Sequence, residues 1–592
     1  MSEPGGGAQH RAILALSFAP DLAPAARAAI EGRGRRALAL LCGGAAPRVG
    51  VADGDLLILE AGGPGPWQLA GDGAFAFSVG MGGTDLRHGR ACDGPGLLAA
   101  LRAAGAAALA DYGPPFAAFF RVNGQAPLEA ATDACGLRHV YVTAGDGFAA
   151  CASSCLALGA LRDDGLDLES LAIYVRVGAH FAARTPIAGV RRLRPGERCE
   201  LAGGGLRVAT WLTASRPDAA FASFADAVEA GVAAMRAAVN TLAAAHEHVG
   251  LSLSGGLDSR LILAALPAER RAALEVLCIE SPTSHDATLV RRLAAQAGFA
   301  PTIVDVGAFP RPRAAAWARG ASLRRDHCAD PFGTAVLEWA ESALAGAPRL
   351  HGQNGEFARG FYYGHAAATV TREAVARILA YWLAWYRDTA RLLAPAYREA
   401  AEETALTEMA AWLTALDRPW LEALDELYLE QRLAPWAGVE LSRTSMRRVD
   451  LSPYCDPRFL AFARRASPEH KRGSRLLLAI LEALDPALAA MPLVTSAPVA
   501  NRMPPRVPTG PNQGPIGAAA VHAQLLEESG ALGIDVARAA ALPLFATDAI
   551  AGPDGAAAPL APGALGFVLS VEWTLEFLEQ ARDHRRERSV SM

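Results

Sequence analysis

The chain has 592 residues, of which 52% are hydrophobic, and a formal net charge of −5, so we expect two or more domains around separate hydrophobic cores. Its one dense basic stretch, RDHRRERS near the end, is too short to indicate nucleic-acid binding as the main function, and no apolar run approaches the roughly 18 residues of a membrane span. The nine cysteines form no CxxC pair and the N-terminus lacks a signal-peptide pattern, which predicts reduced thiols in a cytoplasmic protein.

Residues 11 to about 215 alternate short strand-like segments with turns. Gly, Asp and Pro separate six segments that are typical of strands: RAILALSF, DLLILEA, GAFAFSV, FAAFFRVN, HVYVTAG and GFAACASS. The stretch DGPGLLAALRAAGAAALADYG predicts a helix interrupted at Gly105. This pattern predicts an α+β domain over residues 1–215, followed by a linker near residues 214–225.

From about residue 222 the pattern changes to alternating helices and strands. A long helix precedes the strand VGLSLS, and the strands LEVLCIE, PTIVDV and the start of RLHGQNGE follow with helices between them. Such alternation predicts a parallel sheet with its ligand site at the carboxyl edge. After residue 370 the chain is mostly helical to about residue 490. We therefore assign a second domain to residues 222–500, and a Pro-rich break with a helical extension to residues 501–592.

The segment HVGLSLSGGLDSRLILAAL, residues 248–266, runs from a strand through a glycine turn into a helix. Gly255 and Gly256 permit a tight turn and close backbone approach by a ligand. Residues 254–259 offer successive backbone N–H groups at a helix start, which is a concave site for an anion. Asp258 beside an anion is explained if Mg²⁺ bridges it to phosphate oxygens. The alternative is a plain strand-to-helix turn with an Asp or Ser cap.

Lys471 is the only lysine among 56 basic Lys and Arg residues. Arginine replaces lysine elsewhere, so the single ammonium can mark a place where a compact charge must meet phosphate, although a solvated loop residue is the other interpretation. The same observation excludes a Walker A loop, because no lysine follows a glycine-rich turn.

These stretches resemble the ATP pyrophosphatases, specifically the asparagine-synthetase-like branch. The turn SGGLDS resembles its pyrophosphate-binding loop, CIESPTSHDATLVRRLAAQAG its second synthetase strand, and HGQNGEFARGFYYG its SGEGADExFxGY loop. The segments from FAAFFRVN to FAACASSCLALGAL resemble its glutaminase-type domain. The resemblance implies an Ntn-type αββα domain joined to an α/β synthetase domain with a parallel sheet and many helices, and it implies ATP and Mg²⁺ as cofactors.

The N-terminal domain departs from that family in its nucleophile. A working glutaminase of the family has a cysteine directly after the initiator methionine, whereas this chain has Ser2 and a polar, Gly-rich stretch before RAILALSF. Cys42 lies too deep in the chain to substitute. A flexible tail cannot hold Ser2 in attack geometry, so we expect a glutaminase-like domain without its nucleophile.

The resemblance also implies site residues, position by position. Catalytic roles fall on Lys471, Glu356 and Arg475, the last two through the HGQNGE loop and the Lys-x₃-Arg spacing of KRGSR. Metal ligands fall on Asp258 and Glu356. Nucleotide contacts fall on the first loop, the second strand and the start of the later loop, namely Ser252, Ser254, Gly255, Gly256, Leu257, Asp258, Ser259, Cys278 and Gly352.

Three positions leave alternatives open. Gln353 stands where the family commonly has a glutamate base, and an amide cannot take up a proton at neutral pH, so Glu356 or another group would serve. Arg359 can pair with Glu356 at helical spacing. Asp326, His327 and Asp330, and the stretch YLEQRLAPWAG, can line an acceptor pocket or be ordinary loop charges and buried aromatic residues.

Relatives that lack the glutaminase cysteine join an amine and a carboxylate of one substrate, as β-lactam synthetases and lasso peptide macrolactam synthetases do. The resemblance therefore implies an AMP-forming ligase that adenylates an Asp or Glu side chain of a leader-processed peptide, which the peptide α-amine then attacks. A protease and a leader-binding protein are the expected partners. The alternatives are an amidotransferase or β-lactam-type synthetase acting on a small molecule, and a degenerate scaffold protein.

Overall fold

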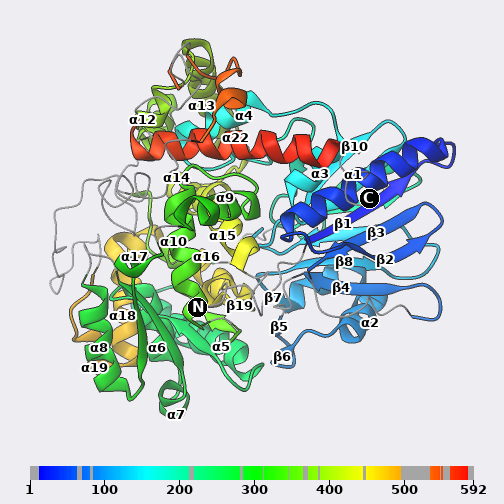
Figure 1. The fold of residues 1–592 in the computed structure, drawn as a ribbon. Coiled ribbons are helices and arrows are strands. Elements are labelled where there is room, and N and C mark those ends of the chain that lie inside the picture. The colour runs from blue at the N-terminus through cyan, green and yellow to red at the C-terminus, as the bar shows by residue number, and fades with distance from the viewer. Residues whose placement is uncertain are drawn as a thin grey trace.

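The structure is a computed structural model, shown in Figure 1. Ser2 and the Pro-rich break lie outside the residues that it describes, which are 12–62, 70–79, 84–212, 219–280, 285–310, 313–344, 346–363, 371–383, 387–444, 448–494, 534–546, 549–550 and 560–583.

The N-terminal part stacks two antiparallel sheets. The six-stranded sheet has the order β12-β10-β11-β1-β3-β2, with β1 at Ala12–Phe18, β2 at Arg48–Asp53, β3 at Leu56–Ala61, β10 at Tyr141–Gly145, β11 at Phe148–Ala152 and β12 at Arg191–Arg192. The five-stranded sheet has the order β14-β13-β9-β8-β4, with β4 at Phe75–Val79, β8 at Ala117–Arg121, β9 at Leu128–Thr132, β13 at Glu197–Ala202 and β14 at Gly205–Thr210. The six predicted strands are confirmed as β1, β3, β4, β8, β10 and β11.

Helices cover the outer faces of both sheets, which gives four layers. Successive side chains of β1 point to opposite faces, so Ile13 packs between the sheets while Leu14 packs under the helices. The covering helices are α1 (Pro24–Leu41) and α3 (Cys155–Leu161) on one side and α2 (Gly94–Ala104) on the other. Gly105 ends α2 with a φ of 61°, and the 3₁₀ helix η1 (Gly105–Asp111) follows. The predicted αββα layering is therefore confirmed.

The second part is built on a five-stranded parallel sheet with the order β17-β16-β15-β18-β19. Its central strand, β15 (Gly250–Ser252), pairs in parallel with both neighbours through Leu251. The other strands are β16 (Glu275–Glu280), β17 (Pro301–Asp305), β18 (Arg349–Leu350) and β19 (Asp450–Leu451). All carboxyl ends meet at one edge, so the loops after β15, β18 and β19 lie side by side although the chain separates them widely.

Helices make up most of the rest of this part, as expected. The structure has α5 at Phe224–Ala244, α6 at Leu257–Ala265, α7 at Ala268–Ala272, α8 at Asp286–Ala297, α9 at Ala314–Arg324, α10 at Pro331–Glu341, α11 at Arg372–Leu383, α12 at Arg387–Ala390, α13 at Pro395–Ala415, α14 at Trp420–Leu427, the π-helix η7 at Tyr428–Ala437, α15 at Gly438–Thr444, α16 at Pro457–Arg465, α17 at Pro468–Lys471, α18 at Arg475–Leu484 and α19 at Pro486–Ala489. The helix α4 at Leu168–Val177 belongs to the N-terminal part and packs against α11 and α13. In the part of the chain that the structure describes, no helix is long and apolar enough to cross a membrane.

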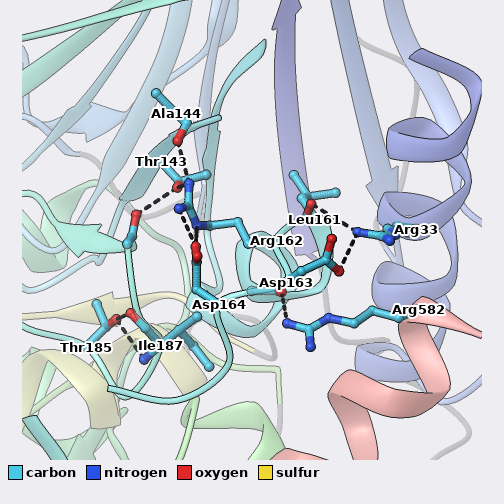
Figure 2. Close-up of polar contacts among 12 residues, drawn as sticks. Arg33, Thr143, Ala144, Leu161, Arg162, Asp163, Asp164, Thr185, Ile187 and Arg582 are labelled. Atoms are coloured by element: carbon cyan, nitrogen blue, oxygen red, sulfur yellow. Dashed lines mark hydrogen bonds and ion pairs between the residues drawn. The ribbon is translucent and has the colours of Figure 1, made fainter. Parts of the chain in front are cut away.

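The last part of the chain packs against both halves of the molecule. Its described helices are α21 (Ala537–Ala540) and α22 (Pro562–Arg582), and α22, red in Figure 1, lies along α1, α3 and α9. Arg582 at its end donates to the carbonyl of Gly159 in α3 at 2.9 Å. Figure 2 shows Arg582 beside Asp163, which follows α3 and pairs with Arg33 at 3.1 Å. The helical end of the chain is thus an integral part of the fold.

Candidate active site

The turn after β15 folds back on itself. Ser254 N donates to Ser259 Oγ at 3.1 Å, and Gly256 N donates to Ser254 Oγ at 3.2 Å. Gly255 N donates to a carboxylate oxygen of Asp286 at 2.6 Å. A carboxylate on this amide, at the start of α6, shows that the turn attracts negative charge, which is the property that a phosphate site requires.

Arg260, which the sequence analysis did not predict as a site residue, holds the turn in place through a hydrogen bond to its backbone. Its guanidinium is fully buried and donates to the carbonyl of Gly255 at 3.1 Å. It also donates to the carbonyl of Leu488 in α19 and to those of Met491 and Pro492 just after that helix. One buried arginine therefore ties the turn to a segment more than 200 residues away in the chain. Its pKa is lowered to about 10 by burial.

The loop after β18 lies directly against the start of α6. A Cβ at Gly352 would come within 2.8 Å of Ser259 N, and a Cβ at Gly355 would overlap the carboxylate of Asp258. A side chain at Gly352 would therefore clash with the backbone, and one at Gly355 would displace the Asp258 carboxylate, so these glycines of HGQNGE are the sequence signal for the contact. The third loop also reaches here, because Tyr454 donates to the carbonyl of Asp258 at 2.8 Å.

The two predicted metal ligands face each other across one arginine. The guanidinium nitrogen Nη2 of Arg359 lies 3.1 Å from Asp258 Oδ2 and 2.6 Å from Glu356 Oε1. The hydroxyl of Tyr428 donates to Glu356 Oε2 at 3.0 Å. Burial raises the pKa of Asp258 to about 7, and the positive charge of Arg359 limits this rise. Two carboxylates at this spacing can share one cation.

These residues fit a divalent metal. Asp258 Oδ1 is buried and has no hydrogen-bond partner among the described residues, so one carboxylate oxygen is left for a ligand. Carboxylate oxygens are the ligands that Mg²⁺ prefers, with phosphate oxygens completing its shell. Arg359 supplies the positive charge in the ligand-free protein.

Lys471 lies in a buried polar cluster beside the same loop. Its Nζ donates to Asp425 Oδ2 at 2.6 Å and lies 5.2 Å from the ring centroid of Phe357, the neighbour of Glu356. The hydroxyl of Tyr363 donates to the same carboxylate oxygen at 2.8 Å. Burial raises the pKa of Asp425, and the positive charge of Lys471 limits this rise. The sequence reading found Lys471 but missed Asp425 and Tyr363, because nothing near lysine in the chain indicates them.

Arg475 is not brought to this cluster. It is exposed, and its guanidinium lies 4.3 Å from the ring centroid of Phe224 on α5. The helical spacing to Lys471 does not hold, because Gly473 and Ser474 have φ values of 65° and 63° and break the helix between them. The two side chains therefore point in different directions.

Of the other predicted site residues, some lie in or beside the turn at residues 254–259 and others lie in the neighbouring strand β16 or in the loop after β18. Ser252 ends β15 and Leu257 is buried at the start of α6. Cys278 is buried in β16, and burial raises the pKa of its thiol to about 12, so it stays protonated. The side-chain oxygen of Gln353 is buried without a hydrogen-bond partner among the described residues.

Asp326 and His327, considered for an acceptor pocket, lie at the contact between the two halves and α22. Asp326 accepts from the hydroxyl of Ser154 and from the amide of Cys155 at 3.1 Å, while His327 Nδ1 bonds to Ser570 at 2.9 Å. Asp330 accepts from Gly333 N at 2.9 Å as the N-cap of α10. Their contacts are with structural partners.

Comparisons with known proteins agree with part of this site. The asparagine synthase family model matches residues 232–318, which contain the turn at 254–259. No curated protein matches the chain. Over the matched residues the chain is similar to asparagine synthase, and this supports ATP-dependent formation of a carbon–nitrogen bond. The loop at 351–356 and Lys471 lie outside the match.

Solved structures similar to the chain include an amidotransferase, a regulatory enzyme of purine biosynthesis and a synthetase. Glutamine phosphoribosylpyrophosphate amidotransferase from B. subtilis, complexed with ADP and GMP, is 11% identical, with a TM-score of 0.21 over 50% of this chain and 81% of that one. The allosteric regulatory enzyme of purine biosynthesis is 12% identical, with a TM-score of 0.23 over 50% and 80%. The NH₃-dependent NAD synthetase from Campylobacter jejuni, in complex with nitrate, is 18% identical, with a TM-score of 0.17 over 35% and 94%.

Proposed function

We propose that this protein is an ATP-dependent, AMP-forming ligase that closes a macrolactam. An Asp or Glu side chain of a leader-processed peptide is adenylated, and the peptide α-amine then displaces AMP. The observation that carries the proposal is the pairing of Asp258 and Glu356 on one cation beside the glycine turn, with Lys471, at the end of α17, against the ring of Phe357 next to Glu356.

The chemistry proceeds in two steps. The substrate carboxylate attacks the α-phosphorus of ATP, the bond to the β-phosphate breaks, and pyrophosphate leaves with its charge held by the turn at residues 254–259. The amine then attacks the acyl carbon, AMP leaves and the amine loses a proton. Mg²⁺ held by Asp258 and Glu356 would neutralise phosphate charge in the first step.

The chain's own residues supply position and charge. Lys471 is buried, so its ammonium interacts more strongly with a developing negative charge than it would in water. Asp425 and Tyr363 fix where that ammonium lies. Gln353 cannot accept the amine proton, which leaves Glu356, oriented by Tyr428, as the carboxylate placed to receive it.

The N-terminal domain would serve as a scaffold and not as a source of ammonia. Its segment after β9 docks on the π-helix η7, where His139 bonds to the carbonyl of Ala434 at 2.8 Å. The amide of Ala182 donates to Gln431 at 3.0 Å on the same helix. An intramolecular amine then needs no glutamine, and a protease that frees this amine would be a partner.

A peptide panel tests the proposal. The purified protein is incubated with ATP, Mg²⁺ and synthetic peptides that carry an internal Asp or Glu and either a free or an acetylated α-amine. We expect AMP and pyrophosphate with both sets, and loss of one water from the free-amine peptides alone. Added ammonia should not change the product. A product that requires ammonia, or no pyrophosphate exchange with any peptide, would overturn the proposal.

A further inference from the structure

The π-helix η7 exposes a narrow strip on an otherwise buried segment. Its ten residues are buried except Glu430, Arg432 and Trp436. The guanidinium carbon of Arg432 lies 4.5 Å from the ring centroid of Trp436, whose exposed fraction is 42%. π-helical segments are uncommon and frequently lie at functional sites. The N-terminal domain holds the buried face of η7, so the exposed residues have a fixed position.

The buried first residue of η7 lies at the candidate active site. Tyr428, at the start of η7, bonds to Glu356, and its ring centroid lies 5.3 Å from that of Phe361. η7 therefore has its first residue at the proposed reaction centre and Trp436 near its other end.

Exposed large apolar side chains also lie at η7, because Trp436 belongs to it and Phe361 contacts its first residue, Tyr428. Among residues whose side chains the structure describes, four large hydrophobic ones are exposed, and the two aromatic ones are Phe361 and Trp436. The other two, Leu40 and Val49, belong to the N-terminal domain. Exposed aromatic side chains beside an arginine are typical of surfaces that bind peptides.

We infer that Phe361, Arg432 and Trp436 form a substrate subsite that binds an aromatic residue of the peptide together with a neighbouring carboxylate. The inference rests on the proposed function. The two aromatic rings offer flat apolar faces, and no described acidic side chain pairs with the guanidinium of Arg432. The subsite leads directly to Glu356, so a peptide held here presents the adjoining segment to the reaction centre.

The test uses synthetic 12-residue peptides with a free α-amine and one internal Glu as the reacting group. Four sets carry, outside that Glu, a Trp–Asp pair, a Trp–Lys pair, an Ala–Asp pair or an Ala–Lys pair. AMP formation is measured against peptide concentration, and the dissociation constant of fluorescein-labelled peptides is measured without ATP. Wild type should prefer the Trp–Asp set.

Two variants probe the subsite. Trp436→Ala should raise KM and the dissociation constant for the Trp–Asp set about tenfold, with kcat changed less than about twofold, because only binding is lost. Arg432→Glu should reverse the preference toward the Trp–Lys set, which a merely structural role would not do.

Arg27→Ala is the matched control, because Arg27 stacks on Phe18 at the same 4.5 Å but in the N-terminal domain. It should leave both constants unchanged. Equal constants for Trp436→Ala and wild type, or no change of preference in Arg432→Glu, would overturn the subsite while leaving the ligase proposal standing. Absence of AMP from wild type with every set would instead remove the proposed function, and the subsite with it.

Discussion

The two halves of the molecule bury carboxylates in opposite ways. In the N-terminal domain, Asp133 accepts four backbone N–H groups at 2.9 to 3.1 Å, from Phe116, Cys135, Leu137 and Arg138. In the second half, Asp258 is paired with Arg359 but has one buried oxygen without a hydrogen-bond partner among the described residues. Burial raises the pKa of both groups.

The difference separates a group that holds a fold from a group that is kept for a ligand. Asp133 organises the turn whose next residues, Arg138 and His139, dock on the second half through Ser442 and Ala434. All four donors to the carboxylate of Asp133 come from its own segment and from Phe116, the residue before β8. An incompletely satisfied buried carboxylate costs free energy, so the arrangement at Asp258 indicates binding of something that completes it.

The largest expected effect is on chemistry and comes from Asp258→Asn. Removing one metal-binding charge should lower ATP–pyrophosphate exchange by at least about 10³-fold, equivalent to roughly 4 kcal/mol of transition-state stabilisation. The melting temperature should stay close to that of wild type, because the carboxylate that is removed has one buried oxygen unsatisfied among the described residues and Arg359 keeps Glu356 as its partner. Exchange within tenfold of wild type would contradict the role of Asp258.

Asp133→Ala is the paired variant in the other half. It leaves four buried amides without an acceptor, and each costs about 1–3 kcal/mol. We expect little folded protein, measured by circular dichroism and gel filtration. A folded Asp133→Ala protein would break the comparison between the two carboxylates.

The second prediction concerns Lys471, for which we expect both a role in the reaction and a role in stabilising the fold. Lys471→Met should lower AMP formation about 10²-fold or more, because a buried positive charge no longer faces the reacting phosphate. It should also reduce the free energy of unfolding by about 3–5 kcal/mol, since Asp425 is left as an unpaired buried charge. Urea denaturation and a pyrophosphate assay measure the two effects.

A double variant separates the effect on AMP formation from the effect on stability. Lys471→Met with Asp425→Asn removes both charges, so most of the lost stability should return while activity stays low. Recovery of activity together with stability would mean that Lys471 acts on the fold alone.

The third prediction sharpens the interpretation of Arg359 as the resting counter-ion of the two carboxylates. Arg359→Gln should raise the affinity for Mn²⁺ in the absence of nucleotide about tenfold, roughly 1.4 kcal/mol, because the metal no longer displaces a guanidinium. Electron paramagnetic resonance of free Mn²⁺ measures the affinity. Arg372→Gln, which removes an exposed pair with Glu403, is the control and should have no effect. An unchanged or lower affinity in Arg359→Gln would be the contrary result.

Local patterns predicted much of this molecule, because strands, turns and caps depend on neighbouring residues. The six N-terminal strands, the break at Gly105 and the strand–turn–helix at residues 250–265 all followed from spacing. Contacts between distant segments could not be predicted in that way. Asp425 is 46 residues from Lys471 in the chain, and Arg260 reaches Met491 across 231. Arg475 was assigned through the Lys-x₃-Arg spacing of the resembling family, and it lies apart from Lys471 because Gly473 and Ser474 between them adopt positive φ values.

The smallest expected effect tests whether the end of the chain supports one half or both. Arg582 donates to Gly159 of the N-terminal domain at 2.9 Å, whereas Ser570, in the first half of α22, bonds to His327 of the second half. Arg582→Ala should therefore lower the free energy of unfolding by about 1 kcal/mol and leave pyrophosphate exchange unchanged, because the lost bond touches the scaffold domain only. Differential scanning calorimetry and the exchange assay measure these outcomes. A fall in exchange larger than the loss of folded protein would show that the anchoring of α22 to the N-terminal domain reaches the turn at residues 254–259, and the division of roles between the halves would then fail.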